Sequence, residues 1–209
     1  MMTTENKIFL TQDEYETMSA KAQEKLDEFY PDLTEERRNS RFRFLMCVMA
    51  AKKVLGQPVN LDDYIPNARF QIKLNGAKIH IVSYKINDTW ATYIKEHHNI
   101  RVPNFSAARQ PDLVYMFVSA TCDPTTYVVE GSLMHKTLME GISLQKDYVN
   151  TYGEPNPNLP QHVEKGATIY GRTQDKSSLY VPNDFLPARG YYETIQLINK
   201  VAAFYGGKK

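Results

Sequence analysis

The feature that most constrains the fold of this chain is an unbroken apolar run, LVYMFVSA, at residues 113–120. The run is rich in β-branched and aromatic residues and is far too short to cross a membrane as a helix, so it predicts a β-strand. Polar residues do not alternate along it, so the strand should be covered on both faces, inside a sheet.

A hairpin is predicted upstream, around the pair Asn75-Gly76. Residues 69–74 and 78–84 have strand character, and Asn-Gly between two such segments is the strongest short-range signal for a two-residue turn. Further strands are predicted at 127–133 and in the segment LYVP before the last turn. The stretch DTWATYIKEHHNIRVPN, at 88–104, is predicted to be a polar loop with aromatic residues.

Two helices are predicted near the N-terminus. The first covers residues 11–30, where Thr11 and Glu14 have the spacing of a capping box. The second runs from Thr34 to about residue 55, with acidic residues in its first turn and Gly56 at its end.

A C-terminal helix is predicted from Arg189. Its apolar positions are expected to be Tyr192, Ile195, Leu197, Ile198, Val201 and Phe204. The order of elements indicates an α/β (α+β) fold with a mixed sheet flanked by helices. We expect an N-terminal helical extension at 1–33 and a single α/β domain at 34–209.

Composition restricts the function classes. The formal net charge is +1, so any binding to nucleic acid would have to use a local patch. Cys47 and Cys122 have no partner at metal-ligand spacing and are expected to be buried thiols in a reducing compartment. No apolar run approaches 18 residues and no signal-peptide core is present, which predicts an intracellular protein without a membrane partner.

Three segments together carry a family resemblance: KLNGAKIHIVS, PDLVYMFVSATCDPTTYVVEGSL and LYVPNDFLP. In order and approximate spacing they resemble the core of the PD-(D/E)XK, or restriction-endonuclease-like, nucleases. The resemblance implies a mixed-sheet core of restriction-endonuclease type, to which this chain would add the two predicted N-terminal helices. It also implies a metal site held by an Asp on the first strand of the hairpin and a Glu-x-Lys on the second.

The positions that match this motif carry other residues. The metal-binding Asp falls on or beside Gln71, the Glu falls on His80 and the Lys falls on Val82. Mg²⁺ prefers hard oxygen ligands, so a neutral amide and an imidazole are poor substitutes, and valine contributes nothing polar. The resemblance therefore predicts a nuclease-like protein that does not cleave and needs no cofactor.

A relocated active site is the alternative. Asp63 precedes the hairpin, Lys85 follows it, and Glu36 lies in the first turn of the second helix, which in many members of the resembled family donates an acidic ligand. Together they could supply Mg²⁺ ligands and a lysine to an active endonuclease. Lys85 has the opposite strand parity to His80, however, and should face away from it.

Two groups of residues are candidates for contact with nucleic acid. The first is basic and opens the second helix, at Arg37, Arg38 and Arg41; guanidinium groups suit phosphate geometry. The second lies in the loop after the hairpin, at Trp90, Tyr93 and Arg101. For the arginines, the alternative is a solvated helix face whose charges pair with acidic residues. For the loop residues, the alternative is a loop anchored to the core.

We therefore expect a non-catalytic nuclease-like protein that acts by binding DNA or protein partners, in the cytoplasm or as a virion or assembly component of bacteriophage origin. The alternatives are the relocated Mg²⁺-dependent endonuclease and a purely structural subunit without a nucleic-acid role. Protein partners or a homo-oligomer are expected, with DNA as the other candidate partner.

Overall fold

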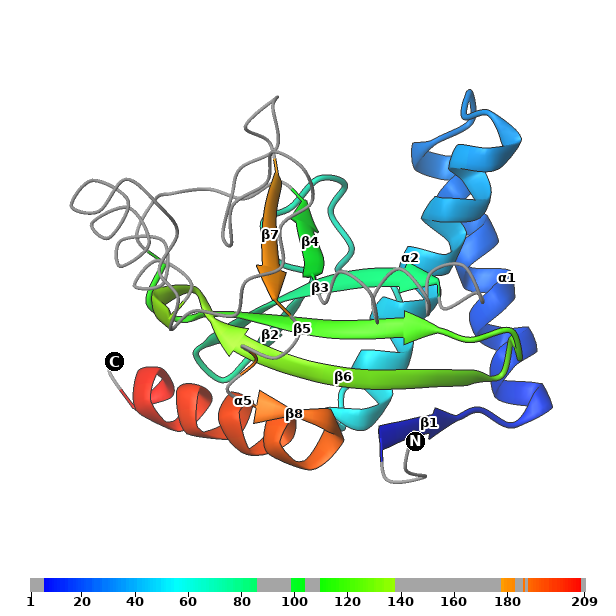
Figure 1. The fold of residues 1–209 in the computed structure, drawn as a ribbon. Coiled ribbons are helices and arrows are strands. Elements are labelled where there is room, and N and C mark those ends of the chain that lie inside the picture. The colour runs from blue at the N-terminus through cyan, green and yellow to red at the C-terminus, as the bar shows by residue number, and fades with distance from the viewer. Residues whose placement is uncertain are drawn as a thin grey trace.

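A computed structural model describes residues 6–85, 99–103, 110–137, 178–182, 186 and 188–207, and the side chains of these residues apart from 84, 85, 99–103 and 178–182. A curved mixed sheet lies at its centre, and helices pack against it (Figure 1). Its elements, in chain order, are β1 Lys7–Phe9, α1 Gln12–Phe29, α2 Glu35–Val54, β2 Ile72–Leu74, β3 Ala77–Lys85, β4 Asn99–Pro103, β5 Leu113–Ala120, β6 Thr126–Met134, β7 Ser178–Pro182, β8 Ala188–Arg189 and α5 Gly190–Gly206.

The strand order of the main sheet is β1-β6-β5-β3-β2, and β8 also pairs with β6. Strands β3 and β5 are parallel, with Ile79 opposite Val114, while the other pairs in this sheet are antiparallel. Every residue of β5 is buried, which confirms the prediction of an interior strand. Strands β4 and β7 form a separate antiparallel ladder (Figure 1).

The predicted hairpin is confirmed, with β2 and β3 joined at Asn75-Gly76. Both turn residues have positive φ, 50° at Asn75 and 148° at Gly76, as the turn requires. The turn packs tightly on the end of α5, since a Cβ placed on Gly76 would lie 2.4 Å from the backbone nitrogen of Gly206. Glycine at position 76 is therefore needed both for its backbone angle and for this contact.

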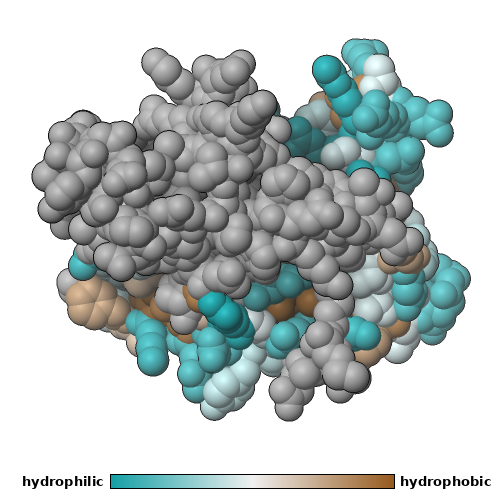
Figure 2. Space-filling model, in the orientation of Figure 1, coloured by the Kyte–Doolittle hydropathy of each residue, from teal (hydrophilic) through white to brown (hydrophobic). Residues whose placement is uncertain are grey.

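The N-terminal helices also form as predicted. In the capping box of α1, the backbone N–H of Glu14 donates to Thr11 Oγ1 at 3.2 Å, and the backbone N–H of Thr11 donates to Glu14 Oε2 at 2.8 Å. Thr34 is the N-cap of α2 but makes no side-chain capping bond, and Gly56, with φ of 64°, follows the helix end. The end of this helix pair where α1 connects to α2 is largely hydrophilic (Figure 2).

One apolar core joins the helices to the sheet. Buried residues of α1, such as Met18 and Leu26, belong to the same cluster as Ile79 of β3 and Val201 of α5. Ile8 of β1 belongs to it as well. The division of the chain at residue 34 stays a prediction. Among the described helices, none combines the length and the apolar character needed to cross a bilayer.

Some expectations were wrong. Residues 99–103, expected in a loop, form β4, because β7 supplies hydrogen-bonding partners from a distant part of the sequence. Cys47 is buried, but Cys122 is exposed.

The apolar positions of the C-terminal helix were only partly right. Tyr192 is 70% exposed and Phe204 is 59% exposed. The buried face of α5 instead follows Thr194, Ile198 and Val201, which are spaced at four and three residues along one side of the helix.

Candidate binding cleft

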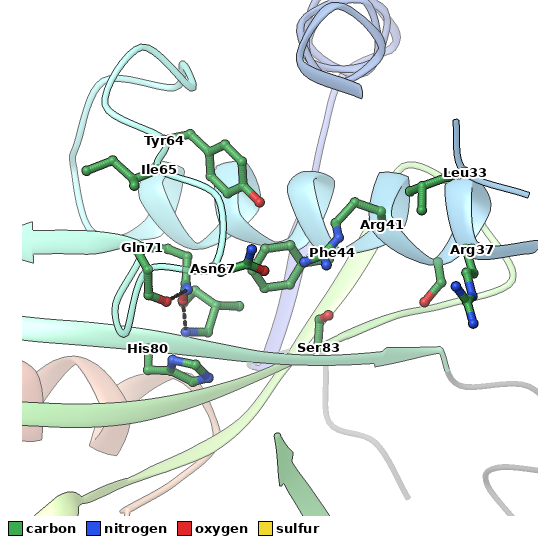
Figure 3. A pocket seen from close by; sticks show the side chains of 13 residues that line it. Leu33, Arg37, Arg41, Phe44, Tyr64, Ile65, Asn67, Gln71, His80 and Ser83 are labelled. Atoms are coloured by element: carbon green, nitrogen blue, oxygen red, sulfur yellow. Dashed lines mark hydrogen bonds between the residues drawn. The ribbon is translucent and has the colours of Figure 1, made fainter. Parts of the chain in front are cut away.

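A cleft of about 520 Å³ lies between α2 and the edge of β3. Helix α2 forms one wall with Arg37, Ser40, Arg41 and Phe44 (Figure 3). The chain between α2 and β2 forms the facing wall, and β3 lies at the base. The cleft lies where the pairing of β2 with β3 has ended, since the last paired residue is Ile79 and no described strand is hydrogen-bonded to this edge of β3 beyond it.

Gln71 lies in this cleft and completes the edge of the sheet with its side chain. Its Oε1 accepts the backbone N–H of Ile81 at 2.7 Å, and its Nε2 donates to the carbonyl of Ala68 at 3.2 Å (Figure 3). Its backbone N–H donates to the carbonyl of Ile79 at 2.9 Å. The amide thus replaces a ladder partner for β3, and both of its ends are used by backbone groups.

His80 lies at the same edge and is 6% exposed. Its Nδ1 lies 2.9 Å from the carbonyl oxygen of Arg69, and because a carbonyl only accepts, Nδ1 carries the proton. Burial lowers the pKa of His80, with the bond to Arg69 opposing the shift, so the imidazole is neutral at pH 7. The ring also makes an edge-to-face contact with Tyr115, with 5.5 Å between centroids.

Val82 is buried and does not line the cleft. By strand alternation it shares a face with His80, while Ile81 and Ser83 lie on the side of β3 that faces α2. Figure 3 shows His80 and Ser83 on opposite sides of the strand. Of the three positions that match the nuclease motif, the structure therefore directs only Gln71 into the cleft; His80 borders it with its ring on the opposite side of β3, and Val82 is buried.

The candidates for a relocated metal site lie elsewhere. Asp63 forms an ion pair with Lys52, a buried lysine that also donates to the carbonyl of Asn60 at 3.0 Å. Glu36 is exposed in the first turn of α2, and neither carboxylate lines the cleft. The side chain of Lys85 lies outside the described residues. In the described ranges, no three His, Cys, Asp or Glu side chains group as metal ligands.

The candidate arginines divide into two sets. Arg37 and Arg41 line the cleft, one turn apart on α2. Arg38 instead pairs with Asp27 of α1. The guanidinium of Arg41 lies 4.8 Å from the ring centroid of Tyr30, which fixes its position by cation–π attraction. Trp90, Tyr93 and the side chain of Arg101 lie outside the described residues.

The charged side chains that line the cleft are all positive. Arg37 and Arg41 are the charged side chains among its described lining residues, and no carboxylate is among them. Hydroxyl groups of Ser40 and Ser83 add further hydrogen-bond donors. Such a lining favours an anionic ligand and provides no carboxylate for a divalent metal ion.

Sequence reasoning missed Asn67, which lies on the wall opposite α2. Its φ is 59°, in the left-handed region that asparagine tolerates better than most residues. The dipeptide Pro66-Asn67 indicated a turn, but a turn signal does not show what the side chain faces. Figure 3 shows the Asn67 side chain directed toward Phe44 and Arg41.

The opposite face of the sheet carries a second set of polar groups, behind His80. The hydroxyl of Tyr115 lies 2.9 Å from Nδ1 of His135, and Ser119 Oγ donates to Glu130 Oε1 at 2.8 Å. These side chains are mostly buried, and burial raises the pKa of Tyr115 well above its ordinary value. They do not line the cleft beside α2.

Comparison with known proteins gave no match: no family model, no curated protein and no solved structure is similar to this chain. The interpretation of the cleft therefore depends on its own residues.

Proposed function

We propose that this chain is a non-catalytic protein of nuclease-like fold that binds nucleic acid through its phosphate backbone in the cleft beside α2. The observation that carries the proposal is the lining of that cleft. Gln71, which matches a metal-ligand position in the resemblance, lines this cleft with Arg37 and Arg41 and without a carboxylate, while the ring of His80 is turned to the opposite side of β3.

The order of elements supports the nuclease-like part of the proposal. A helix, α2, precedes the antiparallel hairpin of β2 and β3, and the chain then crosses to β5, which is parallel to β3. The buried β5 lies beside the strand on which the resemblance places Glu-x-Lys. This arrangement agrees with what the resemblance implies, although fold alone does not fix function.

The hydrogen bonds of the two matching residues support the absence of cleavage. Both ends of the Gln71 amide are used by the backbone of Ile81 and Ala68, and His80 is held as the neutral Nδ1–H tautomer by Arg69. Neither residue supplies the negative oxygen that Mg²⁺ prefers, and Val82 cannot replace a lysine that polarises water. The same strand framework thus uses these positions for structure.

The two arginines support a phosphate ligand. A guanidinium group can donate two parallel hydrogen bonds to a phosphate, and its charge does not titrate near neutral pH. Among the described residues, Arg37 has no ion-pair partner, so its charge is available to a ligand. The chain as a whole has a net charge of only +1, so the binding should be local and of modest affinity. A role within a virion or another assembly would fit such a binding protein.

The test is fluorescence anisotropy with labelled single-stranded and duplex oligonucleotides over a series of salt concentrations. Two phosphate contacts on a single strand predict a log–log salt slope of about −1.4, and Arg37→Gln should reduce its magnitude by about 0.7. Arg38→Gln is the matched control, because Arg38 pairs with Asp27 and does not line the cleft; its slope should equal that of the wild type.

Other outcomes separate the alternatives. Cleavage of plasmid DNA with Mg²⁺ or Mn²⁺, abolished by Asp63→Asn or Glu36→Gln, would show the relocated endonuclease. Absence of binding to either kind of strand at low salt, together with a defined oligomer in solution, would show the purely structural subunit. Equal salt slopes for the wild type and Arg37→Gln would place nucleic-acid binding outside the cleft.

A further inference from the structure

We propose that the cleft accepts one unpaired nucleotide, either within a single strand or as a free mononucleotide, and that Asn67 hydrogen-bonds to its base. This inference rests on the proposed function, because it assigns the kind of nucleic acid that the cleft binds. It adds a recognition residue that neither the sequence nor the resemblance indicated.

The first observation is the state of the two amides in the cleft. The amide of Gln71 is occupied at both ends by backbone groups. The amide of Asn67, on the same wall, makes no hydrogen bond to the described residues and is exposed. It therefore presents a donor and an acceptor side by side, the combination that can pair with the edge of a base.

The second observation is the backbone of Asn67. Its φ of 59° lies in a region where residues other than glycine are uncommon. Glycine would adopt this conformation at a lower cost, but it would remove the amide from the cleft. The side chain reaches across the cleft toward α2 (Figure 3), so the left-handed turn sets the direction in which the amide points.

The third observation is the shape and lining of the cleft. A volume of about 520 Å³ between a helix and a sheet edge is in the range of small-ligand pockets and cannot hold a double helix. A base can enter such a concave site only when it is out of the stack. Ile65, which is 66% exposed, offers apolar surface to the base, while Arg37 and Ser40 on the facing wall can hold the phosphate.

The experiment is a cycle of protein and ligand changes, measured by anisotropy at one low salt concentration. The ligands are a labelled single strand, a duplex of equal length and a fully abasic strand of equal length. The protein variants are the wild type and Asn67→Gly, which keeps the left-handed backbone and removes the amide. Asn75→Gly is the matched control: Asn75 is also left-handed, with φ of 50°, but lies in the hairpin turn outside the cleft.

We expect the wild type to bind the single strand more tightly than the duplex or the abasic strand. Asn67→Gly should weaken binding of the single strand by about three- to tenfold, the effect of one or two net hydrogen bonds, and leave the abasic strand unchanged. Asn75→Gly should match the wild type with every ligand. Displacement of the labelled strand by adenosine or thymidine 5′-monophosphate, but not by inorganic phosphate, would identify a free mononucleotide as a sufficient ligand.

Two results would overturn the inference and leave the proposed function intact. The first is binding of the duplex at least as tight as binding of the single strand. The second is an Asn67→Gly variant that binds the single strand like the wild type, while Arg37→Gln still reduces the salt slope. A protein that binds none of the strands would instead overturn the proposed function.

Discussion

The two edges of the main sheet are built in different ways. At one edge, β6 is covered by two short strands from opposite ends of the chain, β1 and β8. Asn6, just before β1, is bonded to the first turn of α5, just after β8, since its Oδ1 accepts the backbone N–H of Tyr191 at 3.1 Å. At the other edge, β2 covers β3 only as far as Ile79, and Gln71 then bonds to the backbone of Ile81 with its side chain.

The difference separates stability from recognition. At the β1/β8 edge, main-chain bonds hold two very short strands against β6, and short edge strands limit pairing with another chain. The edge of β3 at residues 80–83 has one side-chain bond in place of a strand and borders the cleft instead. A helix, α2, stands beside this edge with its arginines, so the groups with free hydrogen-bonding capacity gather where the described sheet is incomplete.

The largest expected effect is on the closed edge, at Gly131 of β6. A Cβ at this position would lie 2.4 Å from the backbone oxygen of Ala188, so Gly131→Ala must displace β8 or β6. We expect a loss of about 3 kcal/mol in the free energy of unfolding, typical of overpacking in a buried site. Urea denaturation followed by circular dichroism measures it.

Gly56→Ala is the control for this change. Gly56 has φ of 64° and no atom within 4 Å of a Cβ built there, so the variant reports the backbone cost alone. That cost should be about 1 kcal/mol. A Gly131→Ala variant no less stable than Gly56→Ala would show that β8 yields easily and that this edge is not closed.

The next effect is on the edge of β3, at Gln71. Gln71→Ala leaves the backbone N–H of Ile81 without its acceptor in a partly buried position, so we expect a loss of about 2 kcal/mol. Gln71→Glu keeps the acceptor but turns a carboxylate oxygen toward the carbonyl of Ala68, and should be intermediate at pH 7. Urea denaturation of both variants tests this order. Equal stability of Gln71→Ala and the wild type would show that Gln71 does not support the sheet.

Sequence reasoning succeeded where local signals agree with the tertiary structure. The apolar β5, the Asn75-Gly76 turn and the capping box of Thr11 and Glu14 each follow from short-range chemistry. It failed for β1 and β4, which are short and take their strand character from distant partners, β6 and β7.

For the site, the sequence indicated Arg37 and Arg41 but could not separate them from Arg38. Their division depends on Asp27, a residue of another helix. The roles of Gln71 and Asn67 were equally inaccessible. Which amide is used by the backbone depends on how the chain between α2 and β2 lies against β3.

A smaller effect is expected at the junction of the closed edge. Asn6→Ala removes the acceptor for the backbone N–H of Tyr191 in the first turn of α5, while Glu193 continues to accept the N–H of Arg189. Loss of one helix cap should cost about 1 kcal/mol. Hydrogen exchange at the amide of Tyr191 should become faster in this variant. Unchanged exchange there would show that Asn6 does not hold the two chain ends together.

The smallest effect is a pH dependence at the edge of β3, from His80. Burial lowers the pKa of His80 in the folded state, so the unfolded state binds the proton more tightly. The stabilisation is therefore complete above the ordinary pKa of 6.5 and decreases as the pH falls below it. His80→Gln should lose less stability than the wild type between pH 7 and pH 5 in urea denaturation.

The carboxyl groups of Glu14 and Asp123 also have lowered pKa values, but their contributions to stability are lost only below pH 4.5 and pH 3.8, outside this window. Parallel stability curves for the wild type and His80→Gln would mean that His80 is protonated as easily in the folded chain as in the unfolded one. Solvent would then reach the edge of β3 more freely than the burial of His80 indicates.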